Sequence, residues 1–170
     1  MMISIEEQIL DKDGTCRDIT FPIISVEGAS KLLDLFATSF NLNVARDLEG
    51  ETLSISQAQR YIETAVSGMI HAIWQSSELI THIQLFLDWE NRDFSAEITF
   101  FPDDIIQERF SMERFYQFLE PIVQAANSEK FYVRYENASW NIGDTGKGSG
   151  VIFSHEEFNR WAANIKGASS

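Results

Sequence analysis

Residues 82–101, HIQLFLDWENRDFSAEITFF, contain two runs in which apolar and polar side chains alternate. This period of two is typical of β-strands with one buried face, and the Asn91-Arg92 pair between the runs predicts a turn. The stretch therefore predicts a β-hairpin with both sets of apolar side chains on one face. The residues that then lie opposite each other are Trp89 and Phe94, Leu87 and Ala96, and Leu85 and Ile98. A slip of one residue would bury the polar set instead.

The other face of the hairpin mixes charged and aromatic residues, since Phe86 pairs there with Glu97 and Asp88 with Ser95. Residues 131–136 also alternate, which predicts a further strand with its own polar side. Aromatic side chains beside charged ones are typical of protein-recognition surfaces. The candidate partner-binding residues on this outer face are Phe86, Asp88, Glu97, Phe101, Tyr132, Arg134 and Glu136. The alternative is that a helix covers this face too, or that its aromatic side chains only pack against neighbouring strands.

Four helices are predicted around the hairpin, because apolar residues recur there at helical spacing. Their predicted ranges are 26–40, 54–74, 112–127 and 154–166. Ser25 and Ser111 are suitable N-caps for the first and the third helix. The second and the fourth helix open on Ser-x-x-Gln and Ser-x-x-Glu, which is the spacing of a capping box.

The remaining alternating segments predict the other strands. Residues 3–5 and 19–23 flank a turn and predict an N-terminal hairpin, in which Pro22 indicates a strand end or an edge. Residues 41–53 are ambiguous and include one candidate short strand, and residues 151–153 predict another.

Hairpins separated by helices indicate an α+β fold. We expect a largely antiparallel sheet of about five to seven strands, with about four helices packed mainly on one face. The 170 residues fit a single α+β domain spanning positions 1–170.

No catalytic or nucleotide-binding motif stands out in the sequence. The Gly-rich segment 143–150 does not match a phosphate-binding P-loop, because Gly148 follows Lys147 where Ser or Thr is required. Cys16 is the sole cysteine, so the chain has no internal disulfide and no thiolate metal cluster. Acidic neighbours of Cys16 raise a thiol pKa and thus oppose thiolate chemistry.

The three histidines are predicted to be surface residues. His71 would lie on the solvent side of the second helix, His82 on the outer face of its strand, and His155 in the first turn of the last helix. None has a neighbouring acid or histidine at a spacing suited to metal binding. We therefore predict no catalytic residue, no metal site and no cofactor.

The charge of the chain narrows the choice of partners. Asp and Glu number 26 against 13 Lys and Arg, which gives a formal net charge of −13. Such a surface repels phosphate backbones and anionic lipids, which argues against binding to nucleic acid or to a membrane. It attracts a basic protein and accelerates its association. The alternative is that the acidic residues serve only solubility.

The N-terminus has no basic segment followed by an apolar run, so no signal peptide is predicted. The longest uncharged stretch, residues 64–77, is too short to span a bilayer. Together with the single cysteine, these features lead us to expect a cytoplasmic protein.

In its general character, as a small, acidic, cysteine-poor α+β chain without a catalytic motif, the protein resembles the immunity proteins of bacterial toxin–immunity pairs. The resemblance implies a non-enzymatic inhibitor that binds and neutralises a basic toxin domain, often a nuclease. The alternatives are another acidic interaction or regulatory module, for which a homodimer is open, and an enzyme whose catalytic groups converge from distant positions.

Overall fold

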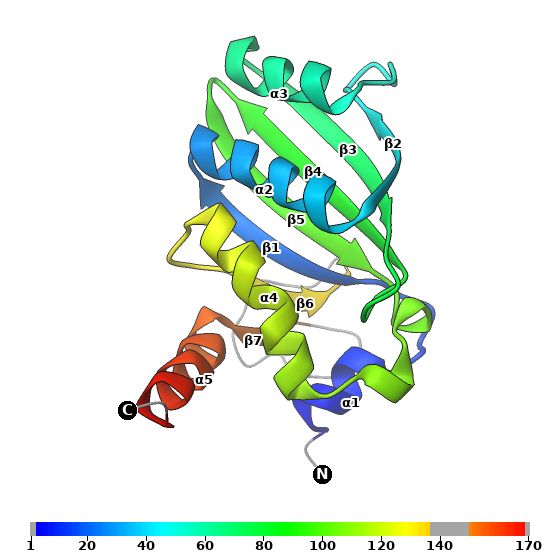
Figure 1. Ribbon diagram of the computed structural model, residues 1–170, viewed down its shortest axis with the longest axis vertical. Helices are drawn as coiled ribbons and strands as arrows, with labels where there is room; N and C mark the ends of the chain where they lie inside the picture. The colour runs from blue at the N-terminus through cyan, green and yellow to red at the C-terminus, as the bar shows by residue number, and fades with distance from the viewer. Residues whose placement is uncertain (1–2, 137–149, 169–170) are drawn as a thin grey trace.

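Figure 1 shows the computed structural model, which describes residues 3–136 and 150–168. One antiparallel sheet of seven strands, in the order β2-β3-β4-β5-β1-β6-β7, carries five helices in this part of the chain. The strands are β1 (Arg17–Ile24), β2 (Asn41–Arg46), β3 (Gly68–Gln75), β4 (His82–Glu90), β5 (Asp93–Phe100), β6 (Tyr132–Tyr135) and β7 (Val151–Ser154). The helices are α1 (Ile5–Leu10), α2 (Val26–Ser39), α3 (Ile55–Thr64), α4 (Met112–Ala126) and α5 (His155–Ala168). The predicted α+β fold is confirmed.

The helices pack on one face of the sheet, with α2, α3 and α4 lying across the strands in Figure 1. The core between the two layers is rich in aromatic rings. Phe36 of α2 meets Trp74 of β3 at 5.7 Å between ring centroids, and Phe115 of α4 meets Phe100 of β5 at 5.9 Å. Helices α2 and α4 are close at Gly28, where a Cβ would lie 2.5 Å from the carbonyl oxygen of Ala126.

The predicted register of the hairpin is confirmed, since β4 and β5 pair Trp89 with Phe94 and keep the expected partners along both strands. The turn has positive φ at both central residues, 51° at Asn91 and 67° at Arg92. This is the type I′ geometry that matches the twist of a hairpin. Arg92 adopts this positive φ, and its side chain donates a hydrogen bond to the carbonyl of Ala65 at 2.9 Å. This bond joins the turn to the end of α3.

The N-terminal hairpin is not formed, because residues 5–10 make the short helix α1 instead of a strand. The Ser4 hydroxyl accepts the backbone N–H of Glu7, and the Glu7 carboxylate accepts the backbone N–H of Ser4. These two hydrogen bonds form a capping box at the start of α1. The second predicted strand of that hairpin is correct and is β1, which lies inside the sheet between β5 and β6. Pairing of β1 with β6 reaches only to Thr20, so the missing N–H of Pro22 leaves no gap in that ladder.

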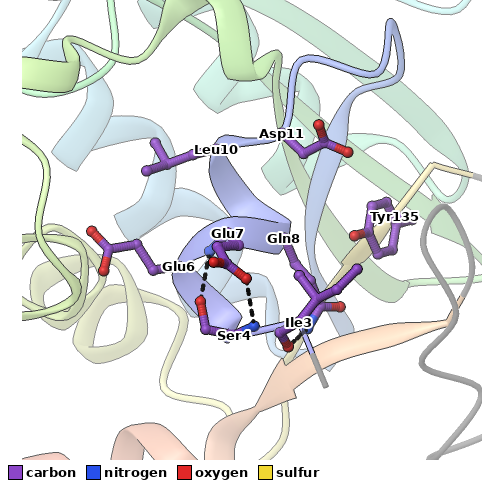
Figure 2. A pocket seen from close by; sticks show the side chains of 8 residues that line it. All are labelled: Ile3, Ser4, Glu6, Glu7, Gln8, Leu10, Asp11 and Tyr135. Atoms are coloured by element: carbon purple, nitrogen blue, oxygen red, sulfur yellow. Dashed lines mark hydrogen bonds between the residues drawn. The ribbon is translucent and has the colours of Figure 1, made fainter. Parts of the chain in front are cut away.

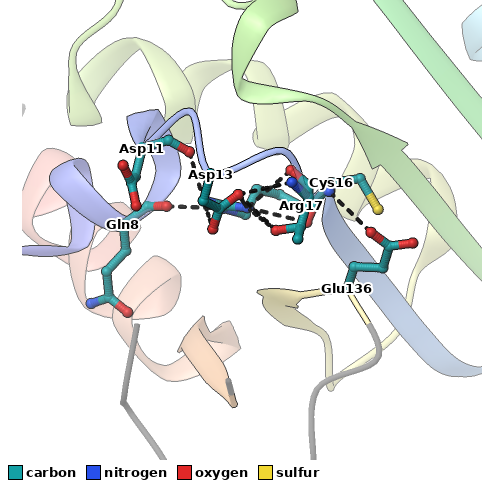
Figure 3. Close-up of polar contacts among 7 residues, drawn as sticks. Gln8, Asp11, Asp13, Cys16, Arg17 and Glu136 are labelled. Atoms are coloured by element: carbon teal, nitrogen blue, oxygen red, sulfur yellow. Dashed lines mark hydrogen bonds and ion pairs between the residues drawn. The ribbon is translucent and has the colours of Figure 1, made fainter. Parts of the chain in front are cut away.

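Arg17 ties α1 to the sheet (Figure 3). Its guanidinium is fully buried and donates to the carbonyls of Gln8 and Asp11, each at 2.9 Å. Asp13 forms an ion pair with it at 3.3 Å, and the group lies 4.3 Å from the centroid of the Tyr135 ring. A buried charge is therefore matched by an acid, by carbonyls at the end of α1 and by an aromatic face.

The second predicted helix is only half correct. It begins with the expected capping box at Ser54, but α3 ends at Thr64 and the chain continues as strand β3. The apolar residues after Val66 suit a strand equally well, and β3 buries alternate residues against the helices. Gly68 starts this strand where a Cβ would lie 2.3 Å from the Tyr61 ring and 2.7 Å from the Trp89 ring.

The other predicted helices and their N-caps at Ser25 and Ser111 are confirmed. The short strand at residues 151–153 is β7, and the ambiguous segment after position 41 contains β2. Most of the Gly-rich segment 143–150 lies outside the described residues. No helix in the described ranges has both the length and the apolar character needed to cross a membrane.

Candidate partner-binding face

Side chains that point away from the helices form what we call the open face of the sheet. In the described part of the chain no helix lies over it (Figure 1). Strand register arranges its residues in rows that cross the sheet. From β2 to β6, the first row contains Arg46, His71, Phe86, Glu97, Thr20 and Tyr132, and the second contains Val44, Ile73, Gln84, Thr99, Asp18 and Arg134. The open face continues beyond the first row with Met69, Asp88 and Ser95.

The predicted partner-binding residues lie on or directly beside the open face. Strands β4 and β5 place Phe86, Asp88 and Glu97 there, and β6 places Tyr132 and Arg134 there. Phe101 and Glu136 follow the ends of β5 and β6 and are exposed, the former to 38%. The structure thus brings these residues together on one surface.

A hollow of about 350 Å³ opens on this face between β1, β4 and β5. It includes four of the predicted residues together with four that the sequence did not single out for binding. The lining residues are Cys16, Asp18, Gln84, Phe86, Glu97, Thr99, Phe101 and Glu136. Asp88, Tyr132 and Arg134 lie outside the lining.

Two carboxyl groups interact within the hollow. Asp18 is 5% exposed, and its Oδ1 accepts hydrogen bonds from the Thr99 hydroxyl at 2.8 Å and the Cys16 thiol at 3.6 Å. Burial, together with the hydrogen bond and the negative charge of Asp18, raises the pKa of Glu97 to about 7, whereas the charge of Arg134 acts to lower it. Glu97 therefore keeps its proton up to about neutral pH, because burial and the neighbouring carboxyl disfavour its charged form.

Cys16 is not a nucleophile in this setting. Burial raises the pKa of its thiol far above the ordinary value, and the charges of Asp18 and Glu136 raise it further. The sequence indicated the effect of the acids, and the structure adds burial as the larger cause. The backbone N–H of Cys16 donates to Glu136 Oε2 at 3.3 Å (Figure 3), which holds that carboxylate at the rim of the hollow.

His71 belongs to the open face rather than to the solvent side of a helix, because its segment is β3. Its ring stacks on Phe86 with 4.3 Å between centroids and an interplanar angle of 6°. Its Nε2 lies 2.8 Å from Gln84 Oε1. Phe86 therefore does pack against a neighbouring strand on one side, while its half-buried ring still lines the hollow.

A larger hollow of about 560 Å³ lies beside α1, with Tyr135 on its wall (Figure 2). The hydroxyl of Ser4 and the carboxylate of Glu7 that face it each accept a backbone N–H of the other residue at 3.1 Å. These groups serve the start of α1. The open face is therefore the better candidate for partner binding.

Sequence reasoning missed Asp18 and His71 for different reasons. The predicted strand over residues 19–23 did not include Asp18, although the alternation that buries Ile19 and Phe21 places Asp18 on the outer face. His71 was missed because its segment was predicted to be helical, whereas it forms strand β3. The β-branched residues Ile70 and Ile73 and the preceding Ser67-Gly68 pair were the available signal for a strand.

No family model and no curated protein matches the sequence. Among solved structures, the fold is similar to a chain in the crystal structure of the toxic C-terminal tip of CdiA from Pseudomonas aeruginosa in complex with immune protein. The TM-score is 0.59 at 12% sequence identity, over 83% of this chain and 94% of that chain. A Pseudomonas aeruginosa T6SS protein matches with a TM-score of 0.36 and 11% identity, over 76% of this chain and 46% of that chain, and this score supports no argument. The fold is therefore one that occurs in a toxin–immunity complex.

Proposed function

We propose that this protein is an immunity protein, a non-enzymatic inhibitor that binds a basic toxin domain at the open face and blocks it. The observation that carries the proposal is the open face itself, where acids and aromatic rings surround a hollow that no helix of the described residues covers. Interfaces of this kind combine aromatic anchors with a charged rim.

Two further observations support the proposal. The formal net charge of −13 favours a basic partner, because opposite charges accelerate association. A chain in a complex of the CdiA toxin tip with immune protein has a similar fold. Since that similarity is one of fold, it supports the class of protein and leaves the binding residues to experiment.

An enzyme is the weaker alternative. Active sites are usually enclosed pockets in which several polar groups converge. The hollow on the open face is small and open to solvent, and its thiol is held protonated. A regulatory module would also use an exposed face, and it differs from an inhibitor in that it would not protect cells from a toxin.

The test uses a candidate toxin domain, which the proposal expects to be encoded in the gene next to that of this protein. Co-expression should restore growth of cells that make the toxin, and the purified proteins should bind each other. Phe86→Ala and Tyr132→Ala should speed dissociation about tenfold or more, because buried aromatic anchors act mainly on the lifetime of a complex. Glu63→Lys is a matched surface control on α3, on the helix side of the sheet.

Growth protection that is lost with the Phe86 and Tyr132 variants but kept with Glu63→Lys supports the open face. Normal binding by both aromatic variants, with loss in the Glu63 variant, would move the interface to the helix side. Failure to protect against the toxin at all would overturn the immunity function.

A further inference from the structure

The hollow on the open face has the chemistry of a site for one positive charge. Three of its lining residues are acids, Asp18, Glu97 and Glu136, and none is a lysine or an arginine. Asp18 lines it while 95% buried, and its hydrogen-bond donors are neutral: the Thr99 hydroxyl, the Cys16 thiol and the protonated Glu97. Among the described residues, no basic side chain lies within ion-pair distance of Asp18 or Glu97.

A buried carboxylate normally has a cationic partner, since leaving its charge unmatched costs several kcal/mol. Arg17 does not supply that partner, because its guanidinium is held by Asp13 and by the carbonyls at the end of α1. Instead, the Asp18 charge is relieved within the free protein by the neighbouring Glu97, which holds a proton against it.

The side walls of the hollow suit the same kind of ligand. Phe86 and Phe101 both line it, and the faces of aromatic rings attract cations. The long apolar stem of a lysine or arginine also packs well on such rings while its charged end reaches deeper.

We infer that the hollow receives one arginine or lysine side chain of the partner, with Asp18 and Glu97 as its counter-charge and Phe86 and Phe101 as its walls. The inference rests on the proposed function and adds the chemistry of the anchor that the toxin supplies.

Binding of that cation should release a proton. In the free protein the pKa of Glu97 is about 7, and a positive charge beside it lowers this pKa because it favours the carboxylate. Affinity should therefore rise with pH up to about 7 and level off above it. Other ionisable side chains near the pair are Cys16 beside Asp18, Arg134 and Glu136 from the β6 side and His71 from β3, and all of them are retained when Glu97 alone is changed to Gln.

The experiment uses the intact protein and a small probe in place of the toxin. The probe is acetyl-Gly-Arg-Gly-amide, with the citrulline peptide as its neutral, nearly isosteric counterpart. Titration by NMR should shift the amides of residues around the hollow, such as Thr99 and Phe86, with the arginine peptide alone. At pH 8, Glu97→Gln should weaken this binding about tenfold, because a charge-assisted hydrogen bond is lost.

Glu63→Gln is the matched control, since Glu63 is an exposed acid on α3, away from the lining of the hollow. It should weaken peptide binding less than about twofold, as expected for a distant screened charge. Equal weakening by both variants, or equal shifts with the citrulline peptide, would overturn the inference.

The same variants separate this inference from the proposed function. If toxin binding depends on Phe86 and Tyr132 but Glu97→Gln has no effect on it at any pH, the immunity function stands and the cation site is wrong. If the arginine peptide binds in the hollow but no toxin does, the site stands as cation-binding and the immunity function is wrong.

Discussion

Gly68 lies where the backbone of β3 passes directly beside two aromatic rings. A Cβ there would meet the Tyr61 ring at 2.3 Å and the Trp89 ring at 2.7 Å. These rings also stack edge to face, with 5.0 Å between centroids, so neither moves without disturbing the other. Residue 68 is thus a contact point between α3, β3 and β4 rather than a flexible joint.

We expect Gly68→Ala to lower the free energy of unfolding by about 1–3 kcal/mol, the usual cost of an overpacked core. The measurement is the urea midpoint and slope followed by Trp fluorescence. Gly167→Ala serves as the control, because a Cβ at position 167 meets nothing within 4 Å. A Gly68 variant as stable as this control would contradict the close packing.

Glu97 should also make stability depend on pH. Its pKa is raised from 4.5 to about 7 in the folded protein, so between these values the folded state holds more protons than the unfolded state. Stability from this group is therefore present at low pH and declines as pH rises from about 4.5 to about 7.

Because Gln does not titrate, the stability of the wild type relative to Glu97→Gln should fall across that window and stay level above it. Urea unfolding at a series of pH values measures the difference, and Asp88→Asn controls for the loss of one acid on the same face. A difference that grows with pH would have the wrong sign and would refute the raised pKa of Glu97.

At the scale of elements, the short helix α1 depends on tertiary contacts, above all on the side chain of Arg17. Its last carbonyls accept bonds from the buried guanidinium of Arg17 rather than from a following turn of helix. A six-residue helix is too short to be stable alone, so its order comes from this tertiary contact and from Ile9 in the core.

Arg17→Met should destabilise the protein by about 3–5 kcal/mol, because it leaves Asp13 and two carbonyls without their buried partner. Hydrogen exchange should accelerate first in α1. The control is Arg160→Met, which breaks an exposed ion pair with Glu157 and should cost about 0–1 kcal/mol. Equal losses in both variants would show that the burial of Arg17 has no special weight.

Elements with one unambiguous period were predictable from the sequence, as the β4–β5 hairpin and helices α2 and α4 show. α1 was not predicted because the spacing of Ile3 and Ile5 also fits an alternating strand, although Ser4 and Glu7 have the spacing of a capping box. β3 was missed because its residues are nearly all apolar, and such a run fits helical spacing by chance.

At the scale of the whole molecule, the order of strands was not predictable. β1 inserts between β5 and β6, and only this long-range pairing brings Asp18 beside Thr99 and near Glu97. Alternation predicted which side each residue of β4, β5 and β6 faces, and thus the composition of the open face. It could not predict the hollow, which depends on strands distant in the sequence.

The charge of the whole chain, −13, leads to a prediction about the rate at which a partner binds. Charges attract a basic protein over long distances at low salt, and this attraction is screened over about 8 Å at physiological ionic strength. Association with a basic protein partner should therefore slow by about tenfold or more as salt is raised, while dissociation changes little. Asp88→Lys and Glu136→Lys at the open face should slow association more than Glu63→Lys on α3, although each changes the net charge by the same amount.

Surface-bound kinetics at several salt concentrations measure both rates for each variant. Equal effects from the three variants would mean that the attraction is not directed to the open face, and association that is independent of salt would mean that the acidic surface serves solubility alone.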